Sequence, residues 1–106
     1  MSLKTQNQER AKFVIDKLEE LKKSSYCDKL SAFILTNGLL PTLAFLQSKT
    51  DKLYNVIEEY LKQKFKTGDK NIIEALADSN SSILRLATKE VMELSNWIRR
   101  LVKSES

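Results

Sequence analysis

The sequence contains no histidine, only two glycines, one proline and one cysteine. Because sandwiches and barrels of short strands need many turn-forming residues, this scarcity excludes them and favours helices. Without histidine, the chain lacks the commonest general base and both the Ser-His and the Cys-His nucleophile pairs. A lone cysteine cannot form an internal disulfide or a Cys/His metal cage. These absences predict a protein that is not an enzyme and that resides in the reducing cytoplasm.

Long apolar segments are also missing. No apolar run approaches the roughly 20 residues that a membrane span needs, and the N-terminus lacks the apolar core of a signal peptide, so we expect no membrane partner. With 106 residues, 42% hydrophobic and 30% charged, the chain suits one globular domain over residues 1–106. The first few residues are expected to be disordered or vector-derived. The net charge of +4 gives only a modest attraction for polyanions.

Apolar residues recur at spacings of three and four, which predicts a compact all-α bundle of about six helices. The helices are expected at about residues 5–23, 26–36, 39–46, 52–66, 72–76 and 83–103. Because the stretch from Leu39 to Leu46 is nearly all apolar, we expect it to be the most buried helix, with Leu43 and Phe45 in the core. The predicted apolar stripe of the first helix comprises Ala11, Val14, Ile15, Leu18 and Leu21.

Residues that could carry catalysis or bind a metal are few. The acidic pairs at residues 19–20 and 58–59 cannot converge on one ion, because neighbouring residues of a helix point about 100° apart. Cys27 is expected to be a partly buried, unreactive thiol. The pair at residues 37–38 is explained by helix capping and is no phosphate loop. We therefore predict no metal and no cofactor.

The last predicted helix carries the most informative pattern. At 100° per residue, five cations and Asn96 fall within a sector of about 100°, opposite an apolar face. These candidate RNA-binding cations are Arg85, Lys89, Arg99, Arg100 and Lys103, and we call them the basic stripe. The opposite face is expected to bury Ile83, Ala87, Val91, Leu94, Ile98 and Leu101, while Glu90 and Glu93 flank the stripe. Such a row could follow nucleic-acid phosphates, or it could be an ordinary solvated surface.

Two aromatic residues lie at the edges of apolar faces. Phe13 falls beside the predicted stripe of the first helix, near Arg10 and Lys17, so Phe13 and Lys17 are a candidate protein interface. Trp97 lies at the edge of the buried face of the last helix, where it is a core anchor or a platform for base stacking.

The segment from Asn37 to Lys49 resembles the signature of the small all-helical (fifth) subunit of Cmr-type, type III-B CRISPR effector complexes. The residues that carry this resemblance are Asn37, Gly38, Leu39, Leu40, Pro41, Thr42, Leu43, Ala44, Phe45, Leu46, Ser48 and Lys49. Gln8 to Ala11 resembles the opening of that family, and the last helix, with Trp97 and its basic residues, resembles its closing pattern.

This resemblance implies a helical subunit without catalytic residues or cofactors. It implies as partners the other Cmr-type subunits, especially the backbone subunit, further copies of the chain in a stacked filament, and the guide and target RNA. The basic stripe would then stabilise the guide–target duplex of a complex that cleaves invader RNA. The alternative is a helical protein–protein adaptor or homo-oligomer without nucleic-acid contact, in which the stripe only maintains solubility.

Overall fold

The computed structural model describes residues 5–105, and every regular element in that range is a helix. In chain order the helices are α1 (Gln6–Asp16), α2 (Leu18–Leu21), α3 (Leu30–Asn37), α4 (Leu39–Ser48), α5 (Lys52–Phe65), α6 (Ile72–Asp78) and α7 (Ser81–Glu105). The predicted all-α bundle is therefore confirmed. The expectation for the first few residues falls on residues 1–4, outside the described range.

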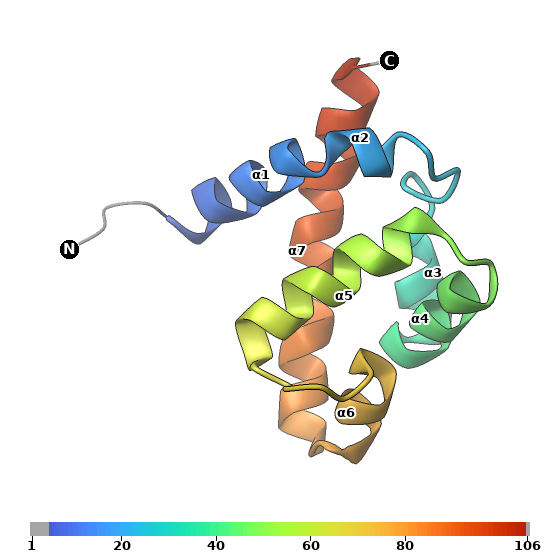
Figure 1. The fold of residues 1–106 in the computed structure, drawn as a ribbon, viewed down its shortest axis with the longest axis vertical. Coiled ribbons are helices and arrows are strands. Elements are labelled where there is room, and N and C mark those ends of the chain that lie inside the picture. The colour runs from blue at the N-terminus through green and yellow to red at the C-terminus, as the bar shows by residue number, and fades with distance from the viewer. Residues whose placement is uncertain (1–4, 106) are drawn as a thin grey trace.

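Helix α7 is the axis around which the other helices are arranged (Figure 1). It packs against α1, α2, α3, α5 and α6, because its apolar face extends over enough turns to be covered by several shorter helices. In Figure 1, α1 and α5 cross α7, while α3 and α4 lie on the side of α7 away from the N-terminal end of α1. Apolar side chains from all seven helices meet in one core, including the fully buried Val14, Leu21, Leu30, Leu43, Ile57, Ile72 and Leu94.

The predicted first helix is divided in two, which is why residues 5–105 form seven helices instead of about six. Lys17 leaves helical geometry at φ −109° and ψ 7°, and its N–H donates to the carbonyl of Val14, 3.0 Å away and three residues back. This tighter turn redirects the chain and aims Leu21 into the core. Gln8 and Thr5 form a capping box at the N-terminus of α1, so this helix begins where the sequence predicts.

The prediction that the third helix, now α4, is the most buried is wrong. Leu39, Thr42, Leu43 and Leu46 are buried, but the opposite side is exposed, and Phe45 is 37% exposed. Helix α5 buries more large residues: Leu53, Tyr54, Val56, Ile57, Tyr60 and Leu61. An apolar run shows which residues could be buried, whereas burial also requires a neighbouring helix on each face, and α4 has none on its outer side.

Two further predicted core positions are exposed for the same reason. Ile15 on α1 is 55% exposed and Ile83 in the first turn of α7 is 36% exposed. No neighbouring helix covers these two side chains, although Val14, next to Ile15 in the chain, is fully buried. Ala87, Val91, Leu94 and Ile98 of α7 are buried as predicted, and Leu101 is half-buried.

Candidate nucleic-acid interface

All five cations of the basic stripe are exposed on α7. The core holds the opposite face of this helix through Val91, Leu94 and Ile98, which are fully buried. Since the helix is anchored along its length, the stripe is displayed on a rigid element. From Arg85 to Lys103 it extends over about 27 Å, at about 1.5 Å per residue.

Four of the five cations of the stripe form no ion pair with the described part of the chain. Within residues 5–105, Arg85, Lys89, Arg99 and Arg100 have no carboxylate within ion-pair distance. Lys103 lies in the last turn of α7, where a cation interacts favourably with the helix dipole. The four arginine and lysine side chains at positions 85, 89, 99 and 100 therefore leave a positive potential along one side of the molecule, which phosphate groups can neutralise.

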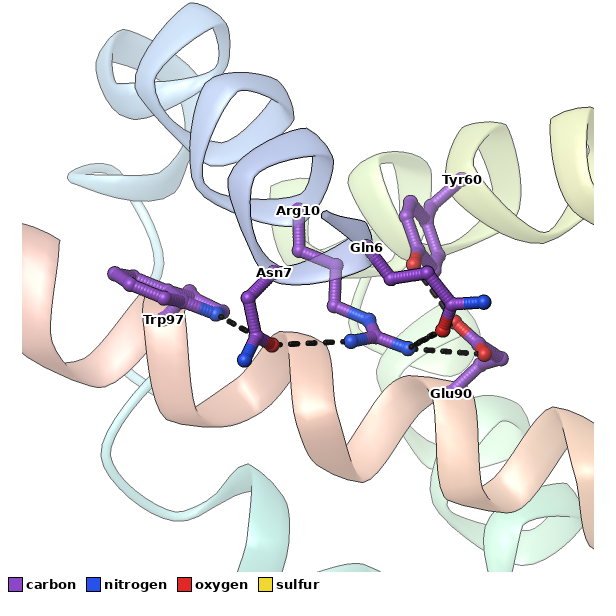
Figure 2. A network of polar contacts seen from close by, with 6 residues as sticks. All are labelled: Gln6, Asn7, Arg10, Tyr60, Glu90 and Trp97. Atoms are coloured by element: carbon purple, nitrogen blue, oxygen red, sulfur yellow. Dashed lines mark hydrogen bonds and ion pairs between the residues drawn. The ribbon is translucent and has the colours of Figure 1, made fainter. Parts of the chain in front are cut away.

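Glu90, predicted as a flanking surface residue, is instead part of a buried polar network (Figure 2). Its carboxylate accepts hydrogen bonds from Arg10 Nη2 at 3.0 Å and from the Tyr60 hydroxyl at 2.8 Å. The Arg10 and Glu90 side chains are only 7% and 12% exposed. Arg10 also donates to Asn7 Oδ1 and to Gln6 Oε1, each at 3.1 Å. The network connects α1, α5 and α7.

The network fixes the charge states of its members. Burial acts to raise the pKa of Glu90, but the hydrogen bonds from Tyr60 and Arg10, together with the Arg10 charge, hold this pKa below its ordinary value. Burial and the contact with Glu90 raise the pKa of the Tyr60 phenol. Glu90 is thus ionised and compensated by Arg10, so it does not neutralise the neighbouring cations of the stripe. The sequence contains one signal of this pairing. Arg10 lies four residues before Val14 and so on the same, buried face of the helix, where an arginine needs a partner of opposite charge.

Phe13 and Lys17, the candidate protein interface, both have partners inside the chain. The Phe13 ring lies 5.2 Å from the Tyr60 ring, centroid to centroid. Lys17 Nζ lies 2.8 Å from Glu59 Oε2 and 5.8 Å from the centroid of Phe13. These contacts join α1 to α5. An interface with another protein stays a prediction for this pair, and their internal contacts do not require it.

Trp97 is half-buried and packs against the core, in agreement with its interpretation as an anchor. Its indole Nε1 donates to Asn7 Oδ1 at 3.5 Å, the same oxygen that accepts from Arg10 (Figure 2). Trp97 therefore helps to fix α1 on α7. Base stacking on its remaining exposed surface stays a prediction.

The family-like segment forms the turn between α3 and α4 and the whole of α4. Gly38 has φ +88°, a conformation that glycine adopts without strain, and it lets α4 begin directly after α3 ends. The Thr42 hydroxyl donates to the Gly38 carbonyl at 2.8 Å, which fixes the turn. Leu39, Leu43 and Leu46 then enter the core, while Pro41, Ala44 and Phe45 remain exposed. Lys49 places its ammonium 5.6 Å from the centroid of the Phe45 ring.

Cys27 and the acidic residues are the remaining side chains that could carry chemistry. Cys27 is buried, and burial raises the pKa of its thiol to about 11, so the unreactive interpretation agrees with its surroundings. Among residues 5–105 no three acidic or cysteine side chains gather where they could hold a metal ion. None of the helices described is both long and apolar enough to cross a bilayer.

Comparison with known proteins identifies a family. The model of a family described as CRISPR-associated protein (Cas_Cmr5) matches residues 6–105, nearly the whole chain. No curated protein and no solved structure matches. The matched range includes the family-like turn, all of α4 and the complete basic stripe.

Proposed function

Because the chain belongs to the Cas_Cmr5 family of CRISPR-associated proteins, and so to the small subunits of Cmr complexes, we propose that it is a non-catalytic structural subunit of a type III-B ribonucleoprotein. In this proposal it stacks beside the backbone subunits, in several copies, within a complex that cleaves invader RNA. Its own task is to stabilise the guide–target duplex through the basic stripe. The single observation that carries the proposal is the row of exposed cations on α7, of which Arg85, Lys89, Arg99 and Arg100 have no ion pair among the described residues.

The arrangement suits contact with a phosphate backbone better than base recognition. The cations follow one helix over about 27 Å and have no rigid polar frame that would present them to base edges. Phosphate contacts position a protein on nucleic acid without reading sequence. A subunit that must accept any guide sequence needs this sequence-independent form of binding, which supports the proposed role.

The test replaces Arg85, Lys89, Arg99 and Arg100 together by glutamate and measures target-RNA affinity in the assembled complex at low and moderate salt. The fold should persist, because these residues lie opposite the apolar face of α7. We expect a large loss of affinity. The plot of log affinity against log salt should become shallower by up to about three per copy, since each phosphate contact contributes roughly 0.7–0.9.

The matched control changes four exposed lysines on other faces, Lys12, Lys23, Lys29 and Lys52, to glutamate. It reaches the same net charge without touching α7, so it separates a local contact from long-range attraction. Unchanged affinity in a fully assembled stripe variant, or an equal loss in the control, would refute the proposal. The first result would leave the adaptor without nucleic-acid contact as the leading interpretation.

A further inference from the structure

A polar hollow of about 480 Å³ lies between the N-terminal end of α1 and the middle of α7. Small-ligand sites have volumes of about 300–1,000 Å³, so the hollow is large enough to admit one nucleotide unit. Its two walls are held in place by the buried ion pair of Arg10 and Glu90, at 3.0 Å. Among the described residues that line it, Leu86 is the only apolar one. The polar side chains that the argument uses are Gln6 and Asn7 from α1 and Lys89 and Glu93 from α7.

The end of α1 offers more hydrogen-bond donors than the chain satisfies. A guanidinium only donates, so Gln6 Oε1 and Asn7 Oδ1 both face Arg10 and each accepts from it at 3.1 Å. Figure 2 shows the amide nitrogen of each side chain pointing away from Arg10. Within residues 5–105 neither amide NH2 group has an acceptor, and neither has the buried Nε of Arg10. Arg10 therefore leaves the two amides to present donors at the hollow.

Two opposite charges on α7 border the same hollow without pairing with each other. Lys89 is exposed and Glu93 is half-buried. They are four residues apart, which is about 6 Å along the helix axis. An i,i+4 pair with the lysine before the glutamate is weaker than the reverse order, and no ion pair joins them. Neither has another partner of opposite charge in the described range, so a ligand can engage both charges.

This combination suits the backbone of RNA better than that of DNA or a protein chain. Lys89 belongs to the basic stripe, so a strand whose phosphates follow the stripe passes over the hollow. Phosphate oxygens only accept hydrogen bonds, which matches Lys89 and the two amides. Glu93 needs a donor, and the 2′-hydroxyl is the one donor of a sugar–phosphate backbone, which DNA lacks. The cores of protein interfaces are depleted in charged residues, unlike this lining.

We propose that the hollow between α1 and α7 binds one ribose–phosphate unit of RNA, with the 2′-hydroxyl donating to Glu93 and the phosphate bound by Lys89 and the amides of Gln6 and Asn7. The inference rests on the proposed function, because the stripe must follow an RNA backbone, and it adds the contact that distinguishes RNA from DNA. A DNA strand would leave the Glu93 carboxylate beside phosphates without a donor, so Glu93 also acts against the wrong ligand.

The test measures binding of the purified full chain, at low salt, to two single-stranded uridine oligonucleotides. One has ribose and the other has 2′-fluororibose, which keeps the sugar pucker of RNA but donates no hydrogen bond. The parent should bind the ribose strand about tenfold more tightly, as expected for one hydrogen bond to a charged acceptor. Glu93→Ala should abolish this preference. Loss of a negative charge strengthens binding of both strands alike, so the ratio of the two affinities reports the hydroxyl contact alone.

The matched control is Glu19→Ala, which removes an exposed carboxylate without an ion pair from α2 and should keep the preference of the parent. Thermal melting checks that each variant is folded. Equal binding of the two strands by the parent, which a hollow for a protein side chain would give, or an undiminished preference in Glu93→Ala, would overturn the inference.

The stripe variant distinguishes this failure from failure of the proposed function. If the parent binds both strands equally and the stripe variant binds neither, the phosphate role of the stripe stands and only the ribose contact is wrong. If the stripe variant binds both strands as well as the parent does, or if the parent binds neither strand, the proposed function fails and the inference fails with it.

Discussion

The junction of α1, α5 and α7 and the pair α3–α4 are stabilised by opposite means. The first is joined by the buried contacts of Arg10, Glu90 and Tyr60, whereas the second contains no charged residue and is joined by apolar side chains. Their outer faces also differ in chemistry: α7 presents cations, whereas α3 and α4 present aromatic rings. The comparison indicates that one small bundle can present two surfaces of different chemistry, cationic on one side and aromatic on the other.

The largest effect is expected when the ion pair at the junction of α1, α5 and α7 is removed. Glu90→Ala leaves the Arg10 guanidinium buried without its counter-ion, so we expect a loss of about 3–5 kcal/mol in the free energy of unfolding. Denaturant titration measures the loss. Glu93→Ala, one turn away and without an ion pair, is the matched control and should change stability by no more than about 0.5 kcal/mol. Equal effects of the two substitutions would show that the network contributes nothing special.

The apolar junction is tested on the two sides of α4. Leu43→Ala removes a fully buried side chain and should cost about 2–5 kcal/mol in unfolding free energy, the usual range for such a cavity. Phe45→Ala should cost less, about 1–2 kcal/mol, because its ring is 37% exposed. The same denaturant titration compares them. If Phe45→Ala is the more destabilising, the outer side of α4 is part of the core.

The smallest expected effect is a difference in how the stability of the two junctions depends on pH. The charged junction of α1, α5 and α7 should weaken in acid, whereas the apolar α3–α4 pair should not. In the folded protein the pKa of Glu90 lies below its ordinary value of 4.5, because the ionised carboxylate is stabilised by its partners. The ionised Glu90 therefore adds to the free energy of unfolding in full above the pKa that it has in the unfolded chain. This stabilisation is lost as the pH falls through the pKa of the folded state. The stability advantage of the parent over Glu90→Gln should therefore shrink between pH 7 and pH 3. The difference between the parent and Leu43→Ala should stay constant, because no charge is involved. A constant difference for Glu90→Gln would contradict the proposed ionisation.

Much of the fold could be predicted from residue spacing. The helical class and the buried faces of α5 and α7 follow from periods of three and four, and the outward position of the basic stripe follows from the same geometry. The family was indicated by the segment from Asn37 to Lys49 and is confirmed by the match over residues 6–105. The position of the break at Lys17 could not be predicted, because a Lys in an otherwise continuous helical pattern gives no signal of a turn.

Sequence alone thus determined which residues share a face, since this depends only on the repeat of the helix. The tertiary structure decided which faces are covered. The ion pair between Arg10 and Glu90 joins residues eighty positions apart, and no local pattern specifies such a partner. The exposure of Ile15, Phe45, Ile83 and Leu86 likewise depends on which helices pack over them. Burial is a property of the assembled bundle, because a side chain leaves water only when another element packs over it.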